Sequence, residues 1–479
     1  METIRLLLAY PEIESSNTNT STYSLPLGLG SIATACKQRF GNSLDVKILD
    51  GSIITHDNQL EEIRKFKPDI TGIAPTIASQ HKGYELGRLA KNLSSLVFYG
   101  GVNSTNLWKN MLTNRDFIDG VILYDGEEPM IQILENKEFD SIPNLAFRDS
   151  RGVYAPAKIY IPKLNDLPDI DYSLFDMKLF LEQTQKRGFG KAVTYYSGKG
   201  CSKRGGMQKS QTYSYEDYIQ LIKNMNICSF CGRNELGFRS FAEEREDRIL
   251  KYLNEEYGIN GFFNVQDTVN LGYTRPLEID AWFRLFLGLE TVNKKNIAKL
   301  KQRYGSKLIF QVGIESADAN MRVAYGKSST NEKDIFDKVR LMSNEGIELH
   351  ASFILGGKGE TKDSMKRTRD TIEKIADYDN VSWILISPQL ILPGSPDYRN
   401  LLQEDGMSEK YSEQDLIDIV EINKDFLRYY SELTREDIIK EIKSIFEVIE
   451  TINNRIVRDV KGVIATEEEF INPYHPYAV

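Results

Sequence analysis

The stretch KAVTYYSGKGC, residues 191–201, has the composition of a β-strand that ends at a cysteine. β-Branched and aromatic residues come first, and glycines that permit a tight turn follow them. Four more short apolar runs come later in the chain, and helical stretches such as 242–258 and 361–377 lie between them. This alternation predicts a βα barrel or partial barrel with its site at the carboxyl ends of the strands. The other predicted barrel strands are 261–267, 307–316, 348–357 and 381–390.

The first 140 residues show the same alternation in shorter units. Their apolar runs end in Gly, Pro or Asp, and amphipathic stretches separate them. This pattern predicts a doubly wound, Rossmann-like parallel sheet whose ligands bind beyond the carboxyl ends of the strands. The predicted strands are 4–10, 45–51, 69–75, 95–101 and 119–126.

The fold class is therefore α/β, with two sheet-based cores joined by a connector and followed by helices. The connector contains a hairpin signal around Asp149–Gly152. Near the end of the chain, Ser412 and Thr434 each begin a capping-box sequence before an apolar helical set. The predicted divisions are a first domain at 1–140, a connector at 141–185, a partial barrel at 186–405 and a helical region with a tail at 406–479.

Composition restricts the class of protein. The 479 residues are 41% hydrophobic and 27% charged, which is ordinary for a globular chain with two or three cores. No apolar run approaches the roughly 18 residues that span a bilayer, so we expect a cytoplasmic protein without a membrane partner. The net charge of −9 argues against a broad nucleic-acid surface. Four cysteines in such a length favour a metal or redox site over a disulfide framework.

The stretch NICSFCGR, residues 226–233, carries Cys228 and Cys231 at a spacing that can hold iron or zinc. A closed site usually needs a third or fourth ligand. Cys36 lies in a predicted core helix, and the 26 residues 202–227 separate Cys201 from Cys228. Cys201 either completes a metal site or is an ordinary buried thiol.

These motifs resemble those of the cobalamin-dependent radical S-adenosylmethionine enzymes. In that family the cysteine motif ends in Cys-x-aromatic-Cys, which is Cys228, Phe230 and Cys231 here, and the aromatic residue lies near the adenine. The resemblance implies that Cys201, Cys228 and Cys231 bind a 4Fe–4S cluster. Three thiolates leave one iron open for S-adenosylmethionine.

The spacing of the first two cysteines departs from the family pattern, in which only a few residues separate them. The extra stretch 207–226 has the spacing of a short amphipathic helix, with Tyr218, Ile219, Ile222 and Met225 on one side. We interpret it as a looped-out helix, because lengthening a flexible loop costs only about 0.6 kcal/mol per doubling. If Cys201 is not a ligand, the cluster is incomplete and the chain is a pseudoenzyme.

Three further motifs extend the resemblance over the barrel. QVGIESAD places Glu315 and Ser316 where the family contacts the ribose and the amino-acid part of S-adenosylmethionine. SFILGGKGET resembles the strand end beneath the adenine, where Gly356 and Gly357 permit close approach of a flat ring. Asp267 ends the second predicted barrel strand, where the family often carries an acidic residue, although a strand-end turn explains it equally well.

The strand ends of the first domain resemble the segments that surround the corrin ring in this family. The pattern D-x-H-x-x-G is absent, so we expect no imidazole of this chain on cobalt. A tight turn is the alternative explanation for each small residue, and GLGSIA (28–33) also fits a dinucleotide pattern, which leaves an NAD-dependent oxidoreductase as a rival. The implied cobalamin-binding residues are Gly28, Gly30, Thr76, Ser79, Gly100, Gly101, Gly126 and Glu127.

The resemblance implies three cofactors: cobalamin, S-adenosylmethionine and a 4Fe–4S cluster. It also implies methylation of an unactivated carbon, in a small molecule or a peptide, through a 5′-deoxyadenosyl radical. Ring contraction or cyclisation without methyl transfer, and a non-catalytic cobalamin- or cluster-binding protein, are the alternatives. The expected partners are the substrate and a flavodoxin- or ferredoxin-like electron donor, and a nucleic acid is not expected.

Overall fold

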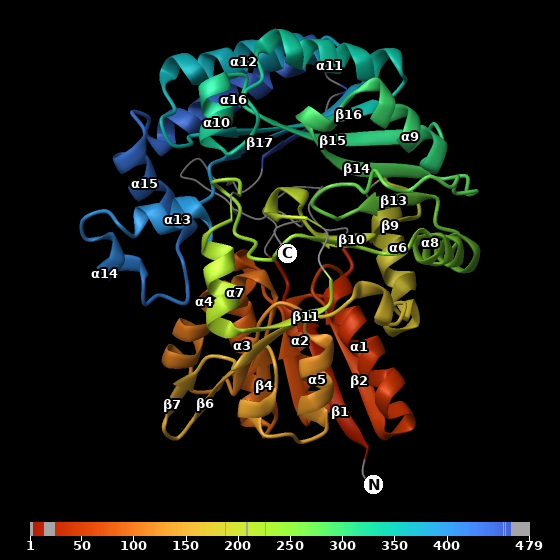
Figure 1. Cartoon of the computed structure of the whole chain (residues 1–479), viewed down its shortest axis with the longest axis vertical. Helices are drawn as coiled ribbons and strands as arrows, with labels where there is room; N and C mark the ends of the chain where they lie inside the picture. Colours follow the sequence, from red (N-terminus) through yellow and green to blue (C-terminus); the bar gives the residue numbers. More distant parts are fainter. Residues whose placement is uncertain are drawn as a thin grey trace.

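The computed structural model describes residues 3–13, 24–186, 188–206, 209–225, 227–453, 455 and 457–460. Two α/β bodies lie one above the other along the long axis of the molecule (Figure 1). The beginning of the chain forms the lower body, and the barrel strands form the upper one. This arrangement confirms the predicted α/β class with two sheet-based cores.

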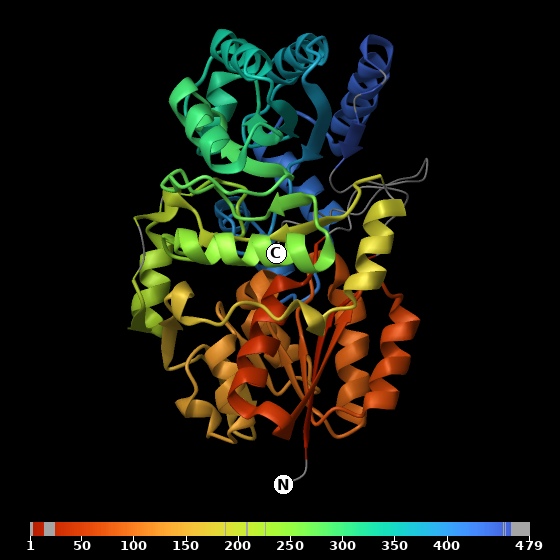
Figure 2. The ribbon, with the colours of Figure 1, turned by 90° about the vertical axis from the view of Figure 1, so that its right-hand side faces the viewer.

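The lower body is a doubly wound sheet in the order β2-β1-β3-β4-β5-β6-β7. The first five of these strands run parallel, and their buried apolar runs are typical of strands covered on both faces. Figure 2 shows this sheet nearly edge-on with helices on either side. The strands are β1 (Ile4–Tyr10), β2 (Leu44–Asp50), β3 (Ile70–Ile73), β4 (Leu96–Tyr99), β5 (Gly120–Ile122), β6 (Leu145–Asp149) and β7 (Gly152–Tyr154).

The hairpin predicted in the connector is present, but it belongs to this sheet. Strand β6 pairs antiparallel with β5, and β7 pairs antiparallel with β6. Cys36 is fully buried in α1, as predicted for a core helix residue. The helices of the lower body are α1 (Leu27–Phe40), α2 (His56–Phe66), α3 (Gln80–Asn92), α4 (Gly101–Asn114) and α5 (Glu127–Leu134).

The upper body is an open, all-parallel sheet in the order β9-β13-β14-β15-β16-β17-β18. Its strands are β9 (Ala192–Tyr195), β13 (Gly261–Asn264), β14 (Trp282–Gly288), β15 (Leu308–Glu315), β16 (Glu348–Leu355), β17 (Val381–Pro388) and β18 (Val457–Val460). Its helices are α6 (Met177–Lys186), α8 (Glu243–Tyr257), α9 (Lys294–Tyr304), α10 (Ala319–Ala324), α11 (Glu332–Asn344) and α12 (Lys362–Ala376). The predicted partial barrel is therefore confirmed.

The barrel differs from the prediction in two respects. Strands β14 and β18 were not expected, and β14 contains the buried Arg284, whose guanidinium lies 4.2 Å from the ring centre of Phe263. The predicted strand 191–201 is in fact two strands. β9 ends at Tyr195, and β10 (Gly198–Gly200) leaves the barrel to pair antiparallel with β12 (Phe238–Ser240). Cys201 thus follows a separate two-stranded ribbon.

The amphipathic helix predicted between Cys201 and Cys228 is present and buries Tyr218 and Ile222, but the stretch packs on the connector and is not looped out. Strand β11 (Gln211–Ser214) pairs antiparallel with the connector strand β8 (Lys158–Ile161), and α7 (Tyr215–Lys223) follows it. Tyr218 and Ile222 are buried against Ile159 and Ile161. Met207, Gln208 and Asn226, at the ends of the stretch, lie outside the described residues.

The C-terminal helices are α13 (Pro396–Leu401), α14 (Met407–Tyr411), α15 (Ile419–Tyr430) and α16 (Arg435–Ile452). The capping box at Thr434 is confirmed at the start of α16. The box predicted at Ser412 is wrong, because α15 begins at Ile419 with Asp418 as its N-cap. The carboxylate of Asp415 instead pairs with Arg115 of the lower body, at 2.6 Å and 3.0 Å.

The segment around Asp415 fastens the C-terminal region to the lower body. Tyr84 donates a hydrogen bond to the Asp415 carbonyl at 3.2 Å, and Asn110 donates to the carbonyls of Ser412 and Gln414. The Asp415 residue is only 4% exposed. A bidentate ion pair that links distant segments in a buried setting holds them in one fixed arrangement.

We expect Asp415→Asn to lower the free energy of unfolding by about 2 kcal/mol, because it leaves the Arg115 guanidinium without its anion. Urea unfolding would measure the loss. The control is Asp280→Asn, which removes the exposed partner of Lys307 and should change the midpoint little. Equal midpoints for Asp415→Asn and the wild type would contradict a fastening role.

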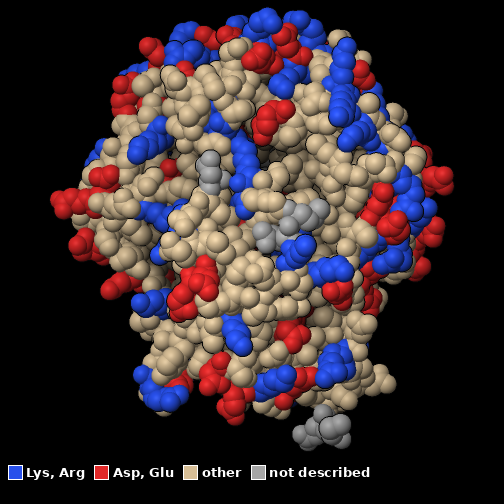
Figure 3. Space-filling model, in the orientation of Figure 1, with Lys and Arg blue, Asp and Glu red and all other residues tan. Residues whose placement is uncertain are grey.

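Acidic and basic side chains are interspersed over the face of the molecule in Figure 3. Within the described ranges, every helix is too short or too polar to cross a bilayer.

Candidate active site

The three cysteines of the resemblance meet at one cavity in the upper body. Cys201, Cys228 and Cys231 all line a cavity of about 340 Å³, whose other walls come from the carboxyl-terminal parts of β14 to β17. Cys201 reaches it from the end of the β10–β12 ribbon, although it is far from the others in sequence. The structure thus brings together three thiols that the sequence separates.

Local hydrogen bonds hold the cysteine loop. The Cys231 N–H donates to the Cys228 carbonyl at 3.0 Å, and the Ser229 N–H donates to the Tyr325 carbonyl at 3.3 Å. The buried Arg204 guanidinium donates to Cys231 Sγ at 2.6 Å. Burial opposes the charge of Arg204, but the surrounding Cys231 and acidic side chains hold its pKa above the usual value. A fixed cation beside a sulfur offsets the negative charge that a metal-bound cysteine carries.

The donor set fits an iron–sulfur cluster better than a single metal ion. In the described part of the chain, no three Cys, His, Asp or Glu side chains converge closely enough to hold one ion. A 4Fe–4S cluster does not require such convergence, because each thiolate binds a different iron. Burial raises the pKa of the Cys228 thiol, whereas Lys327 and Lys203 oppose that shift. Three partly buried thiols around one cavity, with cations beside them, are compatible with a cluster of this kind.

Next to the cysteines, the cavity has a charged and aromatic wall. Glu315 has a positive φ of 66° at the end of β15, and its Oε1 accepts from Lys327 Nζ at 2.8 Å. A non-glycine residue in this backbone region is uncommon and is often found at functional sites. Phe230 packs edge-on against Tyr325 at 5.9 Å, and Lys327 Nζ lies 5.5 Å from its ring centre. Phe230, Glu315 and Lys327 all line the cavity.

Three residues predicted to contact S-adenosylmethionine do not line this cavity, as far as the described residues form it. Ser316 is fully buried, and its hydroxyl lies 3.1 Å from Thr368 Oγ1, away from the cavity walls formed by the described residues. Gly356 has a positive φ of 86°, and a Cβ there would overlap Ile438 of α16. Gly357 faces the ring of Tyr325 in the same way. Each of the three has a packing or hydrogen-bonding neighbour in the structure, and their contact with S-adenosylmethionine stays a prediction.

We expect Gly357→Ala to lower the free energy of unfolding by about 1–3 kcal/mol, because the added methyl would overlap the buried Tyr325 ring. The Tyr325 hydroxyl donates to the Ile354 carbonyl at 3.3 Å, so the ring has little freedom to retreat. Thermal unfolding would measure the loss. The matched control is Gly206→Ala, whose Cβ would meet nothing within 4 Å. Equal melting temperatures for both variants would contradict this packing argument.

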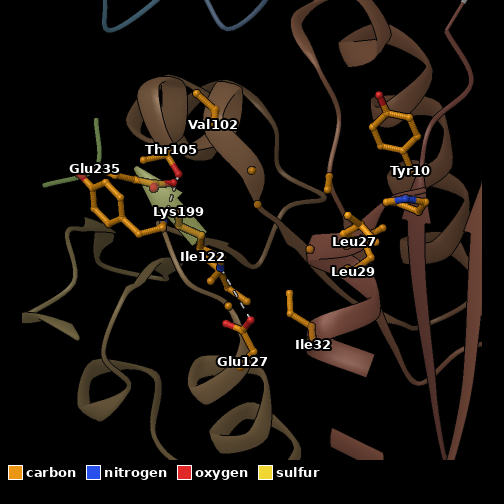
Figure 4. A pocket seen from close by; sticks show the side chains of 18 of the residues that line it. Tyr10, Leu27, Leu29, Ile32, Val102, Thr105, Ile122, Glu127, Lys199 and Glu235 are labelled. Atoms are coloured by element: carbon orange, nitrogen blue, oxygen red, sulfur yellow. Dashed lines mark hydrogen bonds and ion pairs between the residues drawn. The ribbon is translucent and has the colours of Figure 1, made fainter. Parts of the chain in front are cut away.

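A second cavity, of about 250 Å³, lies at the carboxyl ends of the strands of the lower body. Figure 4 shows Leu27, Leu29 and Ile32 of α1 on one side, and Glu127 and Lys199 facing one another on another. The predicted residues Gly28, Gly100, Gly101, Gly126 and Glu127 line this cavity.

The remaining predicted residues of the lower body do not line this cavity, as far as the described residues form it. A Cβ on Gly30 would overlap Phe175 of the connector. Thr76 and Ser79 form a capping box at the start of a 3₁₀ turn, with the Thr76 N–H donating to Ser79 Oγ at 3.0 Å. A packing or turn role, the alternative given for each small residue, accounts for these three positions.

The polar atoms of the second cavity fit a large ligand that carries many amide donors, as a corrin does. Among the described residues, four that line this cavity each carry a buried acceptor atom without a hydrogen-bond partner. Buried acceptors without partners are uncommon in proteins, and a bound group that donates hydrogen bonds is one way to satisfy them. They are Glu127 Oε2, Asn234 Oδ1, Glu235 Oε2 and Asp267 Oδ2. The described walls include no histidine.

The two cavities share a wall. Val265, Gln266 and Asp267, which follow β13, line both of them. Asp267 Oδ1 lies 3.2 Å from Arg233 Nε. The sequence placed Asp267 at a strand end without indicating its position between two cavities.

The sequence did not predict three cations that line the two cavities near the cysteines. They are Lys199, Arg204 and Arg233. Their signal was their position next to the cysteine motifs, in SGKGCSKRGG and CGRNE. Charged residues in glycine-rich segments usually indicate solvent-exposed loops, so the local pattern does not predict buried cations beside the cysteines.

The sequence matches no family model. It is 26% identical to an uncharacterised methyltransferase of Pyrococcus horikoshii over 81% of this chain and 82% of the relative. Its fold matches TsrM from Kitasatospora setae, a radical S-adenosylmethionine methyltransferase solved with cobalamin and a 4Fe–4S cluster. The TM-score is 0.66 at 12% identity, covering 97% of this chain and 92% of TsrM.

The fold also matches OxsB, a cobalamin-dependent S-adenosylmethionine radical enzyme solved with aqua-cobalamin. The TM-score is 0.59 at 18% identity, and the match covers 85% of this chain but only 56% of OxsB. Both likenesses include the two stacked bodies described above. The resemblance that the motifs predicted is thereby confirmed, and the chain has the fold of the cobalamin-dependent radical S-adenosylmethionine enzymes.

Proposed function

We propose that this chain is a cobalamin-dependent radical S-adenosylmethionine methyltransferase that methylates an unactivated carbon of a small molecule or peptide. The observation that carries this proposal is the shared wall at Val265, Gln266 and Asp267. It separates a thiol-lined cavity from an apolar cavity with unpartnered acceptors. Such adjacency is needed when a radical generated on one side must act beside a methyl donor on the other.

Each cavity supplies the groups that its cofactor would need. Cys201, Cys228 and Cys231 would hold the 4Fe–4S cluster, and Arg204 would stabilise the Cys231 thiolate. The Glu315–Lys327 pair would orient the charged end of S-adenosylmethionine by charge and hydrogen bonding. When bound together, the cofactors supply a hydrogen-abstracting radical and a transferable methyl group, while the chain positions them and excludes water.

The lower cavity would hold the corrin. Gly28, Gly100, Gly101 and Gly126 leave its walls open to a flat macrocycle. The unpartnered acceptors, Glu127 Oε2 among them, would accept hydrogen bonds from amide groups on the corrin rim. The missing D-x-H-x-x-G pattern still predicts that cobalt receives no imidazole from this chain.

Anaerobic purification and reconstitution would test this function. We expect one cluster and one cobalamin per chain, and formation of 5′-deoxyadenosine and S-adenosylhomocysteine under reduction. Reduced flavodoxin or ferredoxin should replace dithionite as the electron source. 5′-Deoxyadenosine without S-adenosylhomocysteine would instead favour rearrangement or cyclisation. Failure to bind iron and cobalamin would refute the proposal.

A further inference from the structure

We infer that the adjacent residues Tyr124 and Asp125 form a joint that fixes both ends of the cysteine motif relative to the cobalamin cavity. This inference rests on the cofactors proposed above. It gives a role to α7, which is inserted into the cysteine motif. Tyr124 and Asp125 follow β5 after one residue, Leu123, and Gly126 and Glu127 beside them line the second cavity.

The first half of the joint is a buried ion triad. Asp125 is 4% exposed, and its Oδ1 accepts from Lys199 Nζ at 2.7 Å. Its Oδ2 lies 2.8 Å from Arg239 Nη2. Lys199 and Arg239 are register partners in the β10–β12 ribbon, so one carboxylate of the lower body holds both strands of that ribbon. Burial alone would raise the pKa of Asp125, but the two cations hold it below its usual value.

This triad acts on the first cysteine because of chain connectivity. Strand β10 ends at Gly200, and Cys201 is the next residue. The Cys201 N–H donates to the Gly237 carbonyl at 3.1 Å, next to the start of β12. A shift of the ribbon would therefore carry Cys201 with it, since the thiol is only two residues from Lys199.

The second half of the joint involves the inserted helix. The ring of Tyr124 packs edge-on against Tyr218 of α7, with 4.8 Å between ring centres. The fully buried Tyr218 accepts a hydrogen bond from the Leu236 N–H on its hydroxyl, at 3.4 Å. Leu236 follows Glu235, which lines the cobalamin cavity, and lies shortly after Cys231. Helix α7 thus holds the outgoing end of the cysteine motif.

Backbone geometry supports a positioning role. Tyr124 has a positive φ of 65°, although it is an aromatic residue. Residues persist in this region only where the surrounding structure determines their conformation, and they cluster at functional sites. Tyr124 also lines the cobalamin cavity, where its N–H donates to Thr105 Oγ1 at 3.3 Å. One strained residue therefore touches both the cavity and the inserted helix.

The closing experiment compares Asp125→Asn and Tyr218→Phe with Leu221→Ala, a control on the exposed face of α7 where the side chain is 45% exposed. In reduced holoprotein, cob(II)alamin and the reduced cluster are both paramagnetic, and their magnetic coupling falls steeply with distance. We expect both test variants to retain iron and cobalamin but to lose the wild-type coupling pattern. Leu221→Ala should keep it. A coupling pattern identical to wild type in both test variants would overturn the inference.

A second measurement does not depend on bound cofactors. It can therefore be made on protein without cofactors and on any variant that loses them. Hydrogen–deuterium exchange should be faster in residues 198–204 of Asp125→Asn and in residues 227–237 of Tyr218→Phe than in the wild type. Tyr218→Phe keeps the packed ring and removes only the hydroxyl, so it should remain folded. If exchange in both segments is the same in these variants as in the wild type, the inference is also overturned. If the wild type binds neither cofactor but the two variants still show faster exchange than the wild type, the proposed function alone is refuted.

Discussion

Replacing Cys201, Cys228 or Cys231 with alanine is expected to abolish both the cluster absorbance and 5′-deoxyadenosine formation. The three thiols line one cavity, and two thiolates hold a four-iron cluster poorly. Without the cluster, electrons cannot reach S-adenosylmethionine. Iron content, the visible spectrum and product formation after anaerobic reconstitution would measure the loss in each variant.

The control for these variants is Cys36→Ala. Cys36 is fully buried in α1 of the lower body, far along the chain from the other three. Its replacement should cost about 1 kcal/mol of stability through lost packing and leave the cluster intact. The result that would count against the assignment is full iron content in Cys201→Ala. The third ligand would then not be a cysteine of this motif.

The second large effect is expected at Gly28. A Cβ at Gly28 would meet nothing within 4 Å, and the residue lines the second cavity, where we propose that cobalamin binds. A phenylalanine there would extend into the space that the corrin needs. We expect Gly28→Phe to weaken cobalamin binding by at least roughly 100-fold, or about 2.8 kcal/mol. Titration with cobalamin, followed by its visible spectrum, would measure the change, and cluster content should stay at the wild-type level.

Gly28→Ala is the matched control. The methyl group fits the open space, and alanine is more favourable than glycine in a helix by about 1 kcal/mol. This variant should bind cobalamin as the wild type does and be no less stable. If Gly28→Phe and Gly28→Ala bind cobalamin equally, the cavity beside α1 is not the corrin site.

The sequence predicted the alternating framework well, because buried parallel strands and amphipathic helices leave strong local patterns. It missed β14, where the charged Arg284 interrupts an apolar run and is buried against Phe263. The sequence also predicted that Asp415 forms a capping box with Ser412. The local pattern cannot show that Arg115, 300 positions earlier, pairs with the Asp415 carboxylate. Such long-range pairings depend on tertiary structure and leave no local signal.

The candidate site was predictable to a similar degree. The cysteine motif and the glycines at strand ends are local features, and the structure places Cys201, Cys228, Cys231 and Gly28 on cavity walls. Small residues also pack closely inside proteins, so the sequence could not separate Gly28 from Gly30, which lies against Phe175. The inserted helix looked dispensable because its partners lie in the connector and the lower body.

The partition at Val265, Gln266 and Asp267 limits how an enzyme of the proposed kind could diversify. β13 is only four residues long, and the segment leaving it belongs to both cavities. A substitution at Gln266 would therefore disturb the radical source and the methyl donor together. New substrate specificities would have to arise in the segments that border one cavity alone, such as the loop after β17 that contributes Leu390 and Leu392. Descendants of such a protein would keep the partition while these outer segments vary.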